Sequence, residues 1–192
     1  DKLNSMLRRF NIELSVKDVG LLIGCNMEQK YLFLDEILKS QNKRLKDLIS
    51  FDEFNNELEV LSKDVNNNCR LIPGILNYLN YLFINNYKLV VATSSNLNRY
   101  IDISKRLGIY YYFDKVISSN LLKDSKPNPH IYNKAVEFLD LDKDEIIVFE
   151  DSVNGFMSAS AAGLKNIVGI RSEFYEESVY SKYCTKVIDN FN

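Results

Sequence analysis

The sequence predicts an α/β fold, in which a helical module (residues 1–68) precedes a doubly wound parallel sheet formed by residues 69–192. Three observations support this prediction. Up to about residue 70 the apolar residues recur at helical spacing, and beyond it short apolar runs alternate with helical patterns. That alternation is typical of βαβ units and of parallel sheets. The 192 residues, 46% hydrophobic and 26% charged, suffice for a globular protein with a substantial core.

The helical module is expected to contain four helices. The sequences SVKD at 15–18 and NMEQ at 26–29 resemble capping boxes, which mark helix starts. Three apolar stripes follow helical spacing, and we interpret them as core packing. They comprise Leu3, Leu7 and Phe10; Tyr31, Leu34 and Leu38; and Phe54, Leu58, Leu61 and Val65.

The remaining elements are expected in strict alternation. A helix should follow Pro73-Gly74 and end at Asn85-Asn86, and Gly108 should cap the next helix at its C-terminus. In order, we expect a helix at 74–86, a strand at 88–96, a helix at 97–109, a strand at 113–119, a helix at 129–141, a strand at 145–151, a helix rich in small residues at 152–163, a strand at 166–170 and a short strand at 185–188.

Composition and charge argue against several classes of protein. The net charge of −2 gives no electrostatic footprint for nucleic acid or an anionic membrane, and no apolar run approaches the ~20 residues of a spanning helix. The first residues do not resemble a signal peptide. Cys25, Cys69 and Cys184 are odd in number and lack a CxxC pair, so we expect reduced thiols in a cytoplasmic protein. A single histidine argues against a zinc site built on His and Cys.

The first expected strand ends in a polar cluster. Thr93, Ser94, Ser95 and Asn96 follow the apolar run directly and precede a helix. Hydroxyl groups and free amides at a helix N-terminus can bind phosphate. The alternative interpretation is that the cluster only caps the helix.

Two further strand–helix junctions carry charged residues. Lys126 precedes Pro127 and Pro129, which stiffen the loop, so the lysine is well placed to neutralise an anion, although it could equally lie on the surface. Glu150 and Asp151 end an apolar run and need a cation to offset their repulsion, unless Asp151 is simply a solvated N-cap. Paired carboxylates can hold Mg²⁺, and Asp151 is the stronger candidate for direct ligation.

These motifs together resemble the haloacid dehalogenase-like phosphohydrolases, in the branch with a helical cap that includes β-phosphoglucomutase and phosphoglycolate phosphatase. The resemblance covers nearly the whole chain and implies a Rossmann-like core, with residues 1–68 as its cap. IPGILNYLNYL resembles the family's segment from cap to core, and VVATSSN its second motif, which implies that Thr93 binds phosphate. SKPNPHIY resembles the third motif, which implies that Lys126 balances charge in the site. VFEDSVNGFMSASAAG resembles the fourth, which implies that Glu150 and Asp151 bind the metal.

The sequence departs from the family at the nucleophile. The family's nucleophile and its general acid/base are the two aspartates of a DxDx(T/V) motif, on a strand before the cap. We expect that strand to lie upstream of residue 1. We therefore also expect residues 69–192 to lack the first strand of the core. The DxD-like residues Asp140, Asp142 and Asp144 follow a helix, where the family has a surface loop, and we interpret them as unrelated to catalysis. The resemblance also implies that Gly24 faces the active site.

The function expected on these grounds is a Mg²⁺-dependent phosphatase of small phosphorylated metabolites, acting through an aspartyl-phosphate. Thr93 and Lys126 are its catalytic candidates, and Thr93, Ser94, Asn96 and Lys126 its phosphate-binding candidates. A sugar-phosphate mutase is the first alternative, but IGCNMEQ lacks the arginine expected near this point in β-phosphoglucomutase. A non-catalytic module that binds an anion and a metal is the second. We expect a monomer.

Overall fold

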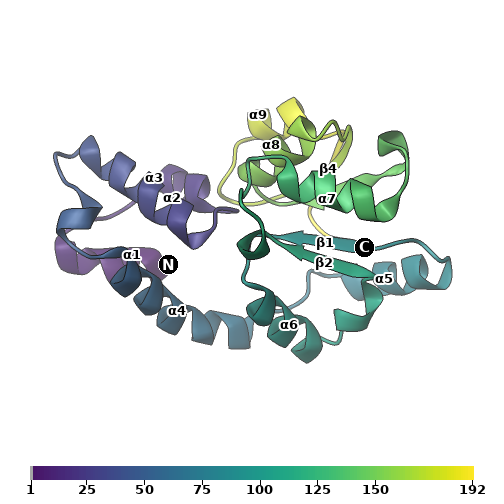
Figure 1. Ribbon diagram of the computed structural model, residues 1–192, viewed down its shortest axis with the longest axis horizontal. Helices are drawn as coiled ribbons and strands as arrows, with labels where there is room; N and C mark the ends of the chain where they lie inside the picture. The colour runs from purple at the N-terminus through teal and green to yellow at the C-terminus, as the bar shows by residue number, and fades with distance from the viewer. Residues whose placement is uncertain (1) are drawn as a thin grey trace.

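The structure is a computed structural model that describes residues 2–192, with side chains at all of these positions except 64–66. Val65 of the third predicted stripe therefore lies outside the described side chains. The helical module lies at one end of the molecule and the α/β part at the other, with the last turns of α4 reaching from one to the other (Figure 1).

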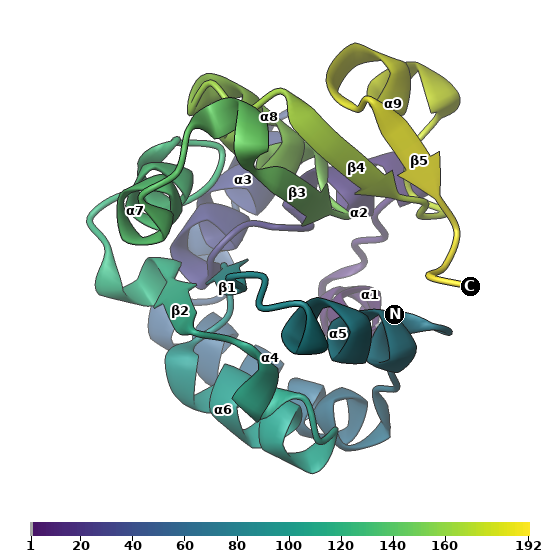
Figure 2. The same ribbon diagram turned by 90° about the vertical axis from the view of Figure 1, so that its right-hand side faces the viewer.

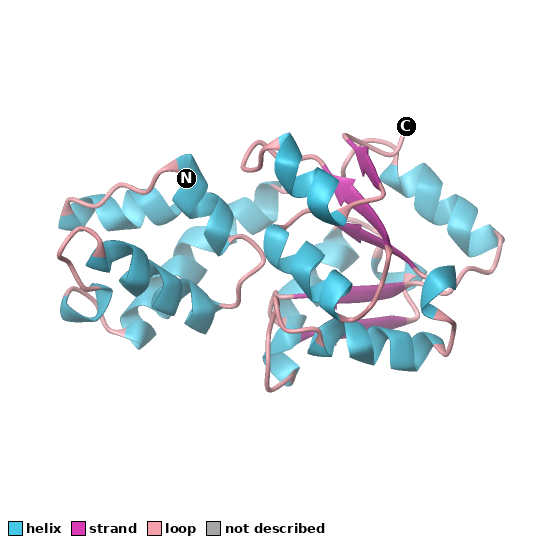
Figure 3. Ribbon diagram, turned by 90° about the horizontal axis from the view of Figure 1, so that it is seen from above, coloured by secondary structure: helices cyan, strands magenta, loops and turns pink. Residues whose placement is uncertain are grey.

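The helical module contains the four expected helices among its described residues. They are α1 (Lys2–Leu7), α2 (Val16–Leu22), α3 (Met27–Lys39) and α4 (Phe51–Asn68), and they are joined by short 3-10 turns at Arg8–Phe10 and Leu45–Asp47. The strands all lie in the other half of the molecule (Figure 3).

Helix starts in this module are fixed by side chains close in sequence. Ser15 Oγ accepts a hydrogen bond from the Asp18 amide at 3.1 Å, and the Ser15 amide donates to Asp18 Oδ2 at 3.0 Å. The predicted box at 26–29 has the same reciprocal bonds. A third box, not predicted from the sequence, joins Ser50 and Glu53 at the start of α4. Each box satisfies amide groups that the first helical turn leaves unpaired.

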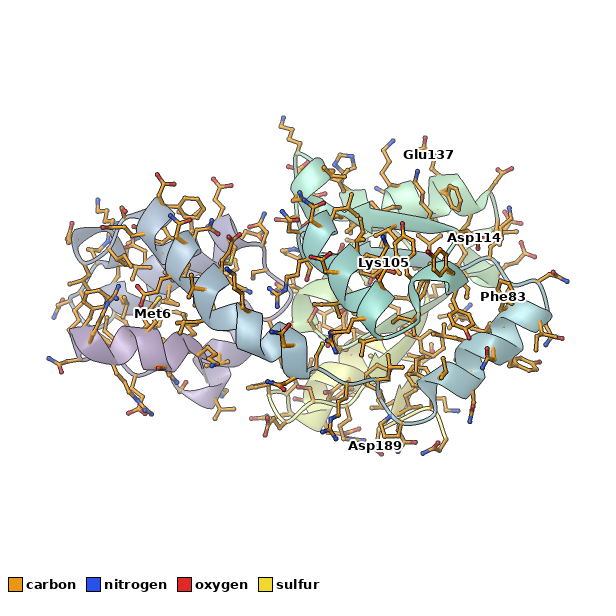
Figure 4. The ribbon with its side chains drawn as sticks, turned by 90° about the horizontal axis from the view of Figure 1, so that it is seen from below. Met6, Phe83, Lys105, Asp114, Glu137 and Asp189 are labelled. Carbon is orange, nitrogen blue, oxygen red and sulfur yellow. The ribbon has the colours of Figure 1, made fainter. Side chains whose placement is uncertain are left out.

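The stripes of the helical module form its core, as expected. Phe54 of α4 is fully buried, and Tyr31 of α3 meets it edge-on with ring centroids 5.3 Å apart. Met6 of α1 points into the same interior (Figure 4). The buried cluster also includes Leu7, Ile12, Leu14, Leu22, Leu34, Leu38, Leu45, Ile49 and Leu58.

The α/β part has the expected alternation of helices and strands. Its elements are α5 (Ile75–Ile84), β1 (Val90–Thr93), α6 (Leu97–Arg106), β2 (Lys115–Ser118), α7 (His130–Leu139), β3 (Ile147–Glu150), α8 (Val153–Ala161), β4 (Asn166–Ile170), α9 (Glu177–Tyr183) and β5 (Lys186–Ile188). Helix α9 was not predicted. Within residues 2–192 no helix is both long and apolar enough to cross a membrane.

All strand pairs are parallel, as predicted, but the strands form two sheets. β1 pairs with β2 from Val90–Lys115 to Thr93–Ser118, and β4 pairs with β3 on one side and β5 on the other. Among the described residues β1 has no second partner and neither has β3. The free edges of β1 and β3 therefore belong to separate sheets with a space between them (Figure 2).

One apolar core holds the two sheets together. The same buried cluster contains Ile117 of β2, Val148 of β3 and Ile167 of β4. Helix α7 contacts β1, β2 and α8, and it contributes the fully buried Ile131. Helices, rather than strand-to-strand hydrogen bonds, therefore link the two sheets across the space between β1 and β3.

The capping box that begins α4 provides a test of the helical module. We expect Ser50→Ala to lower the free energy of unfolding by about 1 kcal/mol, because it removes a hydrogen bond to the Glu53 amide. Urea denaturation measures the change. Ser5→Ala on the exposed face of α1 is the matched control and should have almost no effect. Equal losses in the two variants would contradict the role of the box.

Candidate active site

The predicted site residues meet at one cavity of about 1270 Å³ between the helical module and the carboxyl ends of β1 and β3. Parallel sheets place their loops, and usually their ligands, at this end of the strands. The cavity wall includes all six candidates, namely Thr93, Ser94, Asn96, Lys126, Glu150 and Asp151.

The polar cluster after β1 divides into residues with different partners. Asn96 is the N-cap of α6, accepting a hydrogen bond from the Asn98 amide at 2.9 Å, so the capping interpretation holds for this residue. Ser94 Oγ donates to the Gly24 carbonyl of the helical module at 2.6 Å. Thr93 Oγ1 accepts from the Ser95 amide at 3.0 Å, which leaves its own proton available toward the cavity.

Lys126 is buried, which excludes the interpretation of a surface lysine. Its side chain is 5% exposed, and Nζ lies 2.5 Å from Glu150 Oε2. Nζ also donates to the Ala92 carbonyl of β1 at 3.2 Å and lies 5.0 Å from the centre of the Tyr132 ring. The rigid loop before α7 thus carries a positive charge into the space between the two sheets.

Glu150 is bonded through both of its carboxylate oxygens. Oε2 accepts from Lys126 and, at 2.7 Å, from the Tyr132 hydroxyl. Oε1 accepts from Ser152 Oγ at 3.0 Å and from the amides of Asp151 and Ser152 at 3.1 and 3.3 Å. A carboxylate offers about four lone-pair positions, so this hydrogen-bonding capacity is filled.

These contacts decide the protonation state of the buried groups. Burial by itself raises the pKa of Glu150, but the charge of Lys126 and the hydrogen bonds from Lys126 and Tyr132 outweigh it, so the pKa lies below its ordinary value. Burial and the adjacent Glu150 charge raise the pKa of Tyr132 far above its ordinary value. At neutral pH the site therefore contains a carboxylate and a neutral phenol.

Asp151 differs from its neighbour, because its side chain is accessible at the cavity wall. Its pKa is raised to about 6, first because the surrounding protein removes water from the carboxylate and then because of the Glu150 charge, while Lys126 acts in the opposite direction. The N-cap interpretation fails for Asp151, since Ser152 caps α8 by accepting from the Gly155 amide at 3.1 Å.

The donor set fits Mg²⁺ as a partly protein-bound ion. Mg²⁺ takes oxygen ligands and is commonly held by one or two carboxylates, with water and phosphate oxygens completing the shell. Asp151 is the accessible carboxylate, whereas a direct bond from Glu150 would replace one of its present hydrogen bonds. Among residues 2–192 there is no cluster of three or more carboxylate, His or Cys ligands, so the remaining ligands of such an ion would come from other groups.

The DxD-like residues do not line this cavity. Asp140 ends α7 in a left-handed conformation, and Asp142 caps the 3-10 turn at Lys143–Glu145. Asp144 forms an ion pair with Lys165, with 3.4 Å between Oδ1 and Nζ. Each has a local structural role, in agreement with the interpretation made from the sequence.

Several residues of the site were not singled out from the sequence. Tyr132 lies in the first turn of α7, after the loop that carries Lys126, where its position only suggests a core residue. Gly155 is required by close packing, because a Cβ at this position would lie 1.9 Å from Glu150 Cδ. Asn154 faces the helical module. The run of small residues in α8 was visible in the sequence, but the carboxylate that it accommodates was not.

Comparison with known families identifies the class of protein. The model of the haloacid dehalogenase-like hydrolase family matches residues 2–168, which is most of the chain. The chain therefore belongs to the haloacid dehalogenase-like hydrolases, the family that its motifs resemble.

One sequence relative and two solved structures give more detail. The chain is 33% identical over 98 residues to a phosphorylated carbohydrates phosphatase of Thermotoga maritima, a match that covers 51% of this chain but only 45% of that protein. The β-phosphoglucomutase of Clostridium difficile superposes with a TM-score of 0.75 at 24% identity, covering 100% of this chain and 82% of that one. A predicted phosphoglycolate phosphatase of Haemophilus somnus 129pt gives 0.78 at 21% identity, covering 99% and 85%. These two structures share its fold.

The buried ion pair leads to a prediction about stability. We expect Lys126→Met to lower the free energy of unfolding by about 3–5 kcal/mol, because Glu150 is left charged and buried without a counter-charge. The double variant Lys126→Met/Glu150→Gln should recover part of the loss. The matched control is Lys134→Met on α7, an exposed lysine whose pairing with Glu137 is screened by solvent, so this variant should lose little stability.

The same pair sets the expected pH dependence. Because the pKa of Glu150 is lowered from 4.5, its stabilisation is complete above about pH 4.5 and is lost as the pH falls through the lowered pKa. Acid should therefore destabilise the parent more than the Lys126→Met/Glu150→Gln variant in urea titrations. Parallel pH curves for the two proteins would contradict the assignment.

Proposed function

We propose that the protein is a Mg²⁺-dependent phosphatase of small phosphorylated metabolites, with phosphorylated carbohydrates as the first substrate class to test. The observation that supports it most is the meeting of three groups at one cavity: the Thr93 hydroxyl at the end of β1, the Lys126 ammonium from the loop before α7 and the Asp151 carboxylate after β3. The sequence relation to a phosphatase of phosphorylated carbohydrates adds to this support.

In this proposal the phosphoryl group lies between the tip of β1 and Lys126. Thr93 donates its hydroxyl proton to a phosphate oxygen. Lys126 supplies positive charge from a buried position, where it is worth more than on the surface. Asp151 is the residue that would hold Mg²⁺, which supplies charge neutralisation on the transferring group. Glu150 acts indirectly, by fixing Lys126.

The nucleophile in this proposal is an aspartate that is not among residues 1–192. It attacks phosphorus, and the bond between phosphorus and the substrate oxygen breaks, so that the leaving group departs as an alcohol after taking a proton. Water then attacks the phosphorus of the aspartyl-phosphate, which releases inorganic phosphate and restores the aspartate. The space between β1 and β3 supports a place for it, because both strands present free edges there and Val91, Phe149 and Ile170 line the cavity with apolar surface. A parallel strand in this space would satisfy both edges and would end beside Lys126 and Asp151.

Two alternatives lead to different products. A sugar-phosphate mutase would convert one sugar phosphate into its isomer without net release of phosphate. A binding module would hold phosphate and Mg²⁺ and would change neither. The segment IGCNMEQ, part of which lines the cavity from the helical module, lacks the arginine expected near this point in β-phosphoglucomutase, and for this reason we place the phosphatase before the mutase.

A direct experiment separates the three. The full-length natural protein should release inorganic phosphate from members of a panel of phosphorylated metabolites with Mg²⁺ present, and release should cease with EDTA. Isomerisation of β-glucose 1-phosphate without phosphate release would identify a mutase. Phosphate binding by calorimetry with no turnover of any compound would identify a binding module and overturn the proposal.

The Asp151 carboxylate leads to a prediction about the melting temperature, which should change in opposite directions without and with Mg²⁺. Because its pKa is raised from 3.8 to about 6, its protonated form stabilises the metal-free protein, and this stabilisation is lost as the pH rises through about 6. Without metal, Asp151→Asn should therefore melt at a higher temperature than the parent at neutral pH but not at low pH. With Mg²⁺, the parent should gain thermal stability and the variant should not.

Asp142→Asn is the matched control, since it makes the same substitution outside the cavity and asparagine retains the N-cap hydrogen bond. It should respond to Mg²⁺ as the parent does. An equal response to Mg²⁺ in the Asp151 and Asp142 variants would remove Asp151 from the metal site.

A further inference from the structure

One short segment of the helical module is held against the loop that carries Asp151. Residues 20–26, here called the docking segment, span the end of α2 and the turn into α3. Residues 23–26 line the cavity. The docking segment therefore forms part of the cavity wall as well as the junction between the helical module and the α/β part.

Asn154 contacts the docking segment at several atoms. This residue is in the first turn of α8, three positions after Asp151, and only 8% of it is exposed. Its Nδ2 donates to the carbonyls of Ile23 at 2.8 Å and Leu21 at 3.2 Å, and lies 3.3 Å from Cys25 Sγ. One buried amide group thus contacts three alternate residues of the docking segment, Leu21, Ile23 and Cys25.

Other contacts tie the same segment to the same part of the α/β fold. Ser94 Oγ donates to the Gly24 carbonyl at 2.6 Å, and the Tyr175 hydroxyl donates to the Gly20 carbonyl at 2.9 Å. Gly24 has a φ of +80°, and a Cβ there would lie 2.5 Å from Ser152 Oγ. The backbone at Gly24 therefore packs directly on the residue that follows Asp151.

We propose that Asn154 is a positioning residue that clamps the docking segment onto the Asp151 loop and so fixes the wall of the cavity opposite the reacting phosphate. Asn154 does not touch the substrate. It determines where residues 23–26 lie, and with them the shape of the space left for the group that carries the phosphate. The kinetic part of this inference depends on the proposed phosphatase function, but the structural part does not.

Cys25 provides a structural readout that needs no activity. It is 4% exposed and lies within the docking segment, whereas Cys69 and Cys184 lie elsewhere and are partly exposed; none of the three forms a disulfide within residues 2–192. If Asn154 holds the segment, Asn154→Ala should make Cys25 react with iodoacetamide about tenfold faster or more, since two hydrogen bonds are lost. Peptide mass spectrometry resolves the three thiols, so Cys69 and Cys184 report on global unfolding.

Two further variants sharpen the test. Asn154→Asp keeps the size of the side chain but replaces the donor with an oxygen that faces carbonyls, so it should expose Cys25 at least as much as Asn154→Ala. Asn133→Ala, at an exposed position of α7, is the matched control and should leave all three rates unchanged. Unchanged labelling of Cys25 in both Asn154 variants, or equal acceleration at all three thiols, would overturn the proposal.

The kinetic readout separates positioning from a general loss of structure. In the full-length protein, Asn154→Ala should raise KM for sugar phosphates and so lower kcat/KM for them. The kcat/KM for acetyl phosphate, whose leaving group is small, should stay nearly unchanged. The affinity for Mg²⁺ should not change. Equal losses for both substrates would reject the positioning role. If neither the parent nor the Asn154→Ala variant hydrolyses any substrate, the proposed function fails. Selective exposure of Cys25 then still decides whether Asn154 holds the docking segment.

Discussion

The ion pair between Lys126 and Glu150 is the interaction on which the rest of the site depends. Lys126 reaches from the loop before α7 to the Ala92 carbonyl on β1 and to Glu150 at the end of β3, so one side chain bridges the two separate sheets. Removing two charges from water is costly, and the cost is offset only where every remaining hydrogen-bonding position is filled. Tyr132, Ser152 and two backbone amides meet that condition around Glu150.

This constraint gives two adjacent carboxylates different properties. Glu150 is held ionised by its partners and has a lowered pKa, whereas Asp151 is accessible, beside that charge, and has a pKa raised to about 6. Of these two adjacent residues, Glu150 therefore fixes the position of Lys126, whereas the carboxylate of Asp151 remains accessible. The packing is tight enough that Gly155 is needed where α8 passes the Glu150 carboxylate.

Much of the fold could be predicted because its signals are local. A capping box needs only residues three positions apart, and a strand that ends in polar residues before a helix is visible in a few letters. Helix α9 was missed because the segment 177–183 is short and largely polar, and only Val179, Tyr180 and Tyr183 pack on the core. The Ser50 box had the same signal as the two predicted boxes.

The sequence predicted that the candidate residues would lie near one another, but not which groups they would bond to. Thr93, Lys126 and Asp151 could be found because strand ends in a parallel sheet converge. The sequence offered no means of finding that Lys126 would bond to Glu150, or that Ser94 would donate to a carbonyl 70 residues away, because such pairings arise only when distant segments pack together. Asn154, in the helix after Asp151, has its partners at positions 21–25 for the same reason.

The contacts to the docking segment have a consequence for how related proteins can diverge. Asn154, Ser94 and Tyr175 all bond to main-chain carbonyls of this segment. Every amino acid supplies the same carbonyl, so these three bonds do not depend on the side chains of the segment. Gly24 is restricted by its backbone conformation and by Ser152, and Gly20 by the Phe174 carbonyl oxygen, which would lie 3.2 Å from an added Cβ. Selection for a new leaving group can therefore change the chemistry of this wall while its position is inherited unchanged.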